Sequence, residues 1–142
     1  MATTESAATN EAAHQRWMES LNRGAPAIAE TFASDAAIHL AGHPDVHDRQ
    51  SFAAVLAAVL TAFPDIHFDV PELTTAGDVI AFRWIARATH AGDLVGIAPT
   101  GKSVEFEGLI VDQFQAGKVV RRWEQYDRLE LLQQIGAIPA PG

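Results

Sequence analysis

The sequence predicts a single α+β domain in which helices come first and a sheet of consecutive antiparallel strands follows. Two observations lead to this prediction. Apolar residues recur at helical spacing before Pro64 and at every second position just after it. The connections between the later segments are too short for the crossovers that parallel strands need. A long, bent sheet wrapped over the helices would form a cone with an apolar interior, open at one end, which suits a small-molecule pocket.

The first part of the chain carries the helical pattern. Residues 1–9 are small and polar, so they are predicted to form a disordered tail, and the domain is expected to span residues 10–142. The apolar residues between Trp17 and Leu21 fall at helical spacing. Pro26 suits the first turn of a second short helix, which is expected to run to about Phe32.

A short strand and the clearest helix of the chain come next. The apolar run from Ala36 to Leu40 predicts the strand, and Asp48 is placed to cap the helix. Pro64 and Asp65 end this helix. Its apolar residues, at i, i+3, i+4, i+7, i+8 and i+11, are Phe52, Val55, Leu56, Val59, Leu60 and Phe63.

Four strands and a last helix are predicted after Pro64. The turn formers Gly77-Asp78 and Ala116-Gly117 mark two hairpins, and a Gly- and Pro-containing loop at 92–101 separates the second strand from the third. Gly136 suits the C-terminal cap of the helix. The strands are expected from about Ile66 and at about 79–90, 102–115 and 118–126, and the helix at 129–135.

Composition excludes several kinds of function. The chain has 18 acidic and 10 basic residues and a formal charge of -8, so nucleic acid is not an expected partner. It contains no cysteine, which excludes disulfides, thiol nucleophiles and thiolate metal sites. The N-terminal segment lacks the basic and apolar regions of a secretion signal, and no stretch suits a membrane span. These features predict a soluble, cytoplasmic protein.

Several short motifs after the tail carry a resemblance to a known family. In this order and at this spacing they resemble the SnoaL-like polyketide cyclase family of the NTF2-like superfamily. The motifs are Phe63-Pro64-Asp65, Thr89-His90-x-Gly92, Gly96-x-x-Pro99-Thr100-Gly101, the Gly117-Lys118 turn, Trp123-x-x-x-Asp127 and Leu131-Leu132-Gln133-Gln134-x-Gly136.

The resemblance implies an NTF2-like cone, with a strongly curved sheet around N-terminal helices, and a homodimer packed through the sheets. It also implies ring closure by intramolecular aldol condensation, without metal or organic cofactor. The family's acid/base is an Asp at the end of the last long strand, and Asp127 matches it. The family's partner His would match near Gln113, and no His follows His90 in this chain.

Asp127 has two interpretations. A two-residue period places it on one face with Trp123 and Val119, which suggests an inward and partly apolar setting where desolvation would raise its pKa. Asp127 also precedes the apolar run of the last helix, as an N-cap does. The sequence leaves catalysis and capping open, and the two roles are compatible.

Two histidines are candidates for the donor to a developing enolate oxygen. His90 shares parity with the apolar residues of its strand, which suggests that it points inward, although it could instead hydrogen-bond the 92–101 loop. His39 lies in the strand at 36–40, near the expected cone. Together His39, His43 and His47 could suggest a metal site, but Gly42 and Pro44 forbid the helix that would align them, so none is predicted.

The remaining candidates are substrate contacts. Trp84 and Trp123 would stack on a flat substrate or form core. Glu107 faces the same side as Asp127 if the turn at 115–117 carries a bulge, and the faces exchange if it does not. Gln113 stands near the position of the family His.

Taken together, the residues and the resemblance predict a cofactor-independent enzyme of the lyase or isomerase class. It would act on a small apolar carbonyl or polyketide-like substrate, with Asp127 as acid/base and His90 or His39 as donor. The alternative is a non-catalytic module that binds a small molecule or dimerises. Ring opening of the epoxide-hydrolase type, with Arg83 or Arg87 between two Asp residues, lacks an evident second inward Asp.

Overall fold

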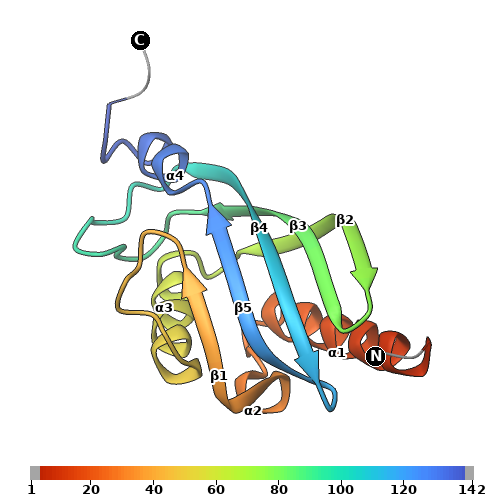
Figure 1. The fold of residues 1–142 in the computed structure, drawn as a ribbon. Coiled ribbons are helices and arrows are strands. Elements are labelled where there is room, and N and C mark those ends of the chain that lie inside the picture. The colour runs from red at the N-terminus through yellow and green to blue at the C-terminus, as the bar shows by residue number, and fades with distance from the viewer. Residues whose placement is uncertain (1–3, 140–142) are drawn as a thin grey trace.

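Four helices and five strands make up residues 4–139, the part of the chain that the computed structural model describes. The predicted α+β class, with N-terminal helices, is confirmed (Figure 1). The helices are α1 (Thr4–Asn22), α2 (Ile28–Thr31), α3 (Arg49–Ala62) and α4 (Arg128–Gln134). The strands are β1 (Phe32–Leu40), β2 (His67–Ala76), β3 (Val79–Thr89), β4 (Ser103–Gln115) and β5 (Lys118–Tyr126).

All five strands belong to one sheet with the order β1-β5-β4-β3-β2. The four strands from β2 to β5 pair antiparallel, as their short connections predict. The first strand, β1, pairs with β5 in parallel, so the sheet is mixed and the prediction of a purely antiparallel sheet is wrong at this edge. The two strands lie far apart in the sequence, and no short connection fixes their relative direction.

The helices lie on one face of the sheet and at one of its ends. In Figure 1, α1 and α3 cover one face, and α4 lies at the end of the sheet where β5 stops. The first helix begins at Thr4, earlier than the expected Asn10, so residues 4–9 are helical and not a disordered tail. Residues 1–3 of that predicted tail lie outside the described part. Helix α3 begins as predicted, because the Asp48 carboxylate accepts a hydrogen bond from the Ser51 amide at 2.9 Å.

A β-bulge in β5 decides which of its side chains face the helices. Phe114 pairs with Val119, and Gln113 pairs with Arg121, so Val120 is an extra residue in β5. The tight turn before it is a plain two-residue turn, Ala116-Gly117, with both φ angles positive as type I′ requires. The bulge therefore lies inside the strand and not at the turn.

The bulge exchanges the two faces of β5 partway along the strand. Val119 is buried before the bulge, and Arg122 is buried after it. From Arg122 onward the even-numbered residues face the helices, while Trp123 is exposed on the outer face. This change of parity is invisible in a strict two-residue pattern.

The inward face and the outer face of the sheet have different characters. Even-numbered residues of β3 and β4 face the helices and form the core with α1 and α3. The outer face carries exposed ion pairs, such as those of Arg83 with Glu72 and Glu107. It also exposes two large apolar side chains, Leu109 and Trp123.

Candidate active site

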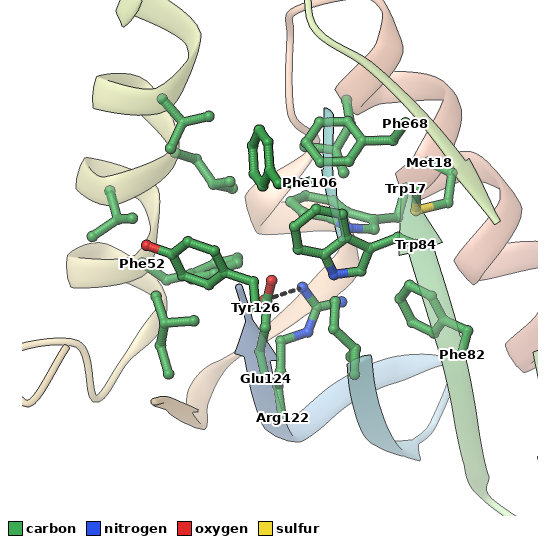
Figure 2. Close-up of a pocket in the computed structure, with 16 residues that line it drawn as sticks. Trp17, Met18, Phe52, Phe68, Phe82, Trp84, Phe106, Arg122, Glu124 and Tyr126 are labelled. Carbon is green, nitrogen blue, oxygen red and sulfur yellow. Dashed lines mark ion pairs between the residues drawn. The ribbon is translucent and has the colours of Figure 1, made fainter. Parts of the chain in front are cut away.

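A cavity of about 70 Å³ lies between the helices and the inward face of the sheet (Figure 2). Its walls come from α1, α3 and all five strands, and they are almost entirely apolar and aromatic. Strand β5 supplies the polar part of the lining through three successive inward residues, Arg122, Glu124 and Tyr126. Local alternation after the bulge brings these three side chains to the same side of the strand.

A larger groove of about 490 Å³ adjoins the cavity at the end of the sheet. It is lined by α3, the 92–101 loop, α4 and the segment that follows α4. Val55, Val59, Phe106 and Tyr126 line both the groove and the cavity. The groove therefore adjoins the inner cavity where Tyr126 lies.

Glu124 is the one carboxylate that lines the cavity, and its side chain is 12 % exposed. Burial raises its pKa from an ordinary 4.5 to about 7, although the charge of Arg122 opposes this rise. Within residues 4–139, its Oε1 is buried and has no hydrogen-bond partner. The indole N–H of Trp84 lies close enough to the Glu124 carboxylate to oppose the rise in its pKa as well. The distance and angle between the two groups nevertheless fall outside those of a hydrogen bond.

Arg122 is held on the side of the cavity by Asp112 of β4. Its Nε and Nη2 donate to the two carboxylate oxygens of Asp112, each at 2.7 Å, and both side chains are 2 % exposed. The remaining nitrogen, Nη1, lies 3.6 Å from Glu124 Oε1, which is longer than a hydrogen bond (Figure 2). Burial lowers the pKa of Arg122, but the charge and hydrogen bonds of Asp112 outweigh it and keep that pKa above its ordinary value.

Aromatic rings fix the guanidinium of Arg122 in place. Its Cζ lies 4.9 Å from the ring centroid of Phe32, 5.5 Å from that of Phe52 and 5.7 Å from that of Trp17. Contacts of this kind stabilise a cation, and more so when it is shielded from water. The cation is therefore fixed by rings as well as by Asp112.

Tyr126 and Trp84 supply hydrogen-bonding groups to the cavity. The Tyr126 hydroxyl lies 2.7 Å from His43 Nε2, at the junction with the groove. Burial raises the pKa of Tyr126. Burial and the nearby charge of Arg128 lower the pKa of His43. Trp84 Nε1 is a buried donor without a hydrogen-bond partner in the described part of the chain. Both side chains could donate to a ligand oxygen.

Asp127 lies at the start of α4. Its carboxylate accepts a hydrogen bond from the Glu130 amide at 3.0 Å, so the predicted cap is confirmed. The expected inward setting is wrong, because the side chain is exposed and does not line the cavity. The bulge at Val120 is the reason, since it puts Asp127 on the face opposite the buried Val119, with which a strict two-residue period groups it.

His90 is buried and holds the loop that borders the groove. Its Nδ1 lies 3.0 Å from Thr100 Oγ1 and accepts a hydrogen bond from the Thr100 amide at 3.3 Å. The inward, buried position is confirmed, and of the two roles that the sequence leaves open for His90, the structure shows the contact with the 92–101 loop. His90 is not among the residues that line the cavity or the groove.

Of the predicted substrate contacts, the structure places Trp84 in the cavity wall. The other four lie elsewhere: His39, Glu107, Gln113 and Trp123 are on the outer face. The expected position of His39 near the interior is wrong, since Ile38 and Leu40 occupy the inward positions of β1. Glu107 does share a face with Asp127, but that face is the exposed one.

Sequence reasoning missed Glu124, Arg122 and Tyr126. A two-residue period groups Asp127 with Trp123 and Val119 on a face expected to point inward, and this grouping leaves the three even-numbered residues on the other face. One signal could have found them: a bulge in β5 would place Arg122 and Asp112 opposite one another on the inner face, as a compensated buried pair.

Two other classes of site are not found in the described part. Within residues 4–139, no group of three or more His, Cys, Asp or Glu side chains is arranged to hold a metal ion. His43 and His47, from the histidine group considered above, bond instead to Tyr126 and to the Asp45 carbonyl. No helix between residues 4 and 139 has the length and apolar character that crossing a membrane requires.

Several solved structures share this fold, and their names describe enzymes of related kinds. AclR from Streptomyces galilaeus, named as a candidate hydroxylase, is 25% identical, with 96% of this chain and 86% of that chain covered and a TM-score of 0.85. IdmH from Streptomyces antibioticus, named as a candidate polyketide cyclase, is 30% identical, with 89% and 98% covered and a TM-score of 0.78. No curated protein matches the chain significantly.

A protein from Jannaschia sp. CCS1, named as a candidate SnoaL-like polyketide cyclase, has a TM-score of 0.85 at 17% identity, with 98% of this chain and 99% of that chain covered, and so supports the fold alone. The family model for SnoaL-like polyketide cyclases matches residues 11–135, which include the C-terminal part of α1 and the whole sheet. This match covers most of the chain and confirms the family that the sequence motifs suggest. The chain belongs to the SnoaL-like polyketide cyclase family.

Proposed function

We propose that this protein is a cofactor-independent acid/base enzyme that removes a proton next to the carbonyl group of a small, largely apolar, polyketide-like substrate. Glu124 is the base in this proposal. The observation that carries it is a buried carboxylate with a pKa of about 7 in an otherwise apolar cavity. Membership in the SnoaL-like polyketide cyclase family supports the same reaction class.

The setting of Glu124 suits proton removal from carbon. A carboxylate whose pKa is near 7 is a much stronger base than an ordinary glutamate, and about half of it is ionised at neutral pH. The apolar walls exclude water, so the charge is not screened when substrate is bound. Within residues 4–139, the buried Oε1 of Glu124 has no hydrogen-bond partner, so it can accept a proton from substrate.

The enolate oxygen that forms in this step requires a hydrogen-bond donor. In the tautomer with a proton at Nε2, His43 donates to the Tyr126 oxygen and leaves the Tyr126 hydroxyl hydrogen for a substrate oxygen. The indole N–H of Trp84 is a second donor in the cavity wall. These two groups take the role that the sequence assigned to His90 or His39.

Two outcomes follow from one enolate. In an aldol cyclisation, the carbon nucleophile attacks a second carbonyl of the same molecule, a C–C bond forms, and the new alkoxide takes the proton from Glu124. In an isomerisation, Glu124 returns the proton to a different carbon. Both outcomes regenerate the carboxylate and consume no co-reactant, so the proposal includes no cofactor.

The aromatic wall of the site favours a substrate with a flat face that can stack on it. Trp84 and Phe106 form part of the wall, with their ring centroids 5.7 Å apart in an edge-to-face arrangement. The inner cavity holds the reacting end, and the groove beside Tyr126 takes the rest of the molecule. In this proposal, the cavity and the groove together serve as the substrate pocket.

Carbon deprotonation can be measured without the natural substrate. The protein is incubated in deuterated water with a panel of cyclic ketones and β-keto esters, and deuterium uptake is followed by mass spectrometry. We expect uptake to fall by at least about 100-fold in Glu124→Gln while binding of the same ketone persists. Asp127→Asn is the matched control, because it removes an exposed carboxylate of the same strand end and keeps a capping side chain.

The alternative, a non-catalytic binding module, gives a different result in the same experiment. It predicts tight binding of a panel member with no uptake above the protein-free rate. Uptake that is lost in Asp127→Asn but retained in Glu124→Gln would instead return the catalytic role to Asp127.

A further inference from the structure

The arrangement of the two buried carboxylates around Arg122 is uneven. Asp112 receives both short hydrogen bonds of the guanidinium, at 2.7 Å each, while Glu124 lies at 3.6 Å from the remaining nitrogen. Glu124 lines the cavity, and Asp112 does not. The carboxylate that substrate can reach is therefore the one that Arg122 holds least.

We propose that Asp112 is a positioning residue for Glu124: it occupies the hydrogen-bonding edge of Arg122, so that Glu124 makes only a longer ion pair with Arg122, at 3.6 Å, and stays free to accept a proton from substrate. This inference rests on the proposed function of Glu124 as the base. Asp112 itself does not touch the reacting atoms.

Geometry makes the competition between the two carboxylates direct. The guanidinium presents its donors in a fixed planar fork, so the edge that binds Asp112 in a two-fold contact cannot bind Glu124 at the same time. The rings of Phe32, Phe52 and Trp17 surround the Cζ atom and hold the guanidinium in this orientation. Without the negative charge of Asp112, Glu124 is the carboxylate of residues 4–139 that remains paired with this cation (Figure 2).

The remaining polar groups around Glu124 are few. Strand β5 contributes Tyr126, and β3 contributes the indole of Trp84. From α1, His14 lies near Asp112 and Arg122, and burial lowers its pKa. The cavity-lining residues of α3, β1, β2 and β4 are apolar. The balance between Asp112 and Arg122 therefore dominates the electrostatic setting of Glu124.

Two variants are expected to affect the titration midpoint of Glu124 differently. In Asp112→Asn the guanidinium charge is no longer compensated by Asp112, so Arg122 pairs more closely with Glu124, and the titration midpoint of Glu124 falls from about 7 by at least about one pH unit. In the double variant Asp112→Asn/Arg122→Gln both charges are removed, and the midpoint stays within about half a unit of the wild type. The double variant removes the charges of Asp112 and Arg122 together, so neither of these two groups is left without its partner, and it is also the safer of the two to fold.

The midpoint is read from the side-chain carboxyl carbon of Glu124 by ¹³C NMR on the full chain, with the resonance assigned by its loss in Glu124→Gln. Asp69→Asn is the matched control, because Asp69 makes an exposed ion pair with Arg87 at 3.1 Å on the outer face. This control should leave the midpoint unchanged. The titration needs no substrate, so its outcome is independent of whether deuterium exchange is found.

Three results would overturn the proposal. One is a midpoint in Asp112→Asn that equals the wild-type value. Another is a rise of more than about one unit in the double variant, which would show that Arg122 serves mainly as the partner of Glu124. A fall in the double variant as large as that in Asp112→Asn would also contradict it. In the active enzyme, the acidic limb of the plot of deuterium-exchange rate against pH should shift by the same amount as the titration midpoint of Glu124. A purely structural role of Asp112 would not cause this shift.

Discussion

Replacing Glu124 with Gln is expected to stabilise the protein at neutral pH while it abolishes proton transfer. The wild-type carboxyl group pays a desolvation cost when it ionises inside the cavity, and burial accordingly raises its pKa to about 7. Between pH 4.5 and about 7 the folded protein holds a proton that the unfolded chain has released. The free energy of unfolding of the wild type therefore falls as pH rises through this window.

The size of the effect follows from the two pKa values. They are 4.5 for an ordinary Glu and about 7 in the cavity, a difference of about 2.5. Each pKa unit corresponds to about 1.4 kcal/mol, so the ionised carboxylate costs the fold on the order of 3 kcal/mol above pH 7. Glu124 is 12 % exposed, so solvent screening reduces this figure little.

Urea unfolding at several pH values between about 4 and 8 measures the difference between wild type and variant. We expect the stability advantage of Glu124→Gln to grow by about 3 kcal/mol from the lower to the upper end of this range. Glu19→Gln, an exposed substitution on α1, is the control and should show no such growth. A difference between wild type and Glu124→Gln that does not change with pH would refute the reasoning.

Four further predictions concern other parts of the molecule. Burial lowers the pKa of His14, so the wild type should lose stability as pH falls below about 6.5, and His14→Leu should lessen this loss in acid unfolding curves. Gly108→Ala would place a Cβ 2.5 Å from the Trp84 ring, so it should cost about 1–3 kcal/mol in chemical denaturation and alter tryptophan fluorescence. Asp127→Ala should cost about 1 kcal/mol of stability through loss of the cap, with deuterium exchange retained. The outer sheet face exposes Leu109 by 61%; if this face forms the homodimer that the family resemblance implies, Leu109→Lys should yield monomers in sedimentation velocity, and a wild-type monomer would contradict this.

The elements that local sequence determines could be predicted closely. Helix α3 has its cap at Asp48 and its apolar stripe within one continuous segment, and the hairpin turn at Ala116-Gly117 is set by adjacent residues. The four antiparallel strands follow from short connections. In each case, the residues that decide the structure are neighbours in the chain.

Features that depend on distant parts of the chain could not be predicted in the same way. The parallel pairing of β1 with β5 joins segments at opposite ends of the domain. The bulge at Val120 is specified by the fit of β5 against β4, and nothing in the local pattern marks it. The family resemblance points to Asp127, and an unbroken two-residue period supports it by placing Asp127 and Trp123 inward; this single extra residue exchanges the two faces of β5 and brings Glu124 inward instead. Trp84 was placed correctly because β3 is regular throughout.

The pH dependence of deuterium exchange tests most directly whether Glu124 is the base. For a panel ketone that the protein binds, the exchange rate should rise with pH to a plateau, with an apparent pKa near 7. Glu124→Gln should remove the protein-dependent rate at every pH, and Asp127→Asn should keep both the plateau and the apparent pKa. A rate that persists in Glu124→Gln with the same apparent pKa would contradict the account.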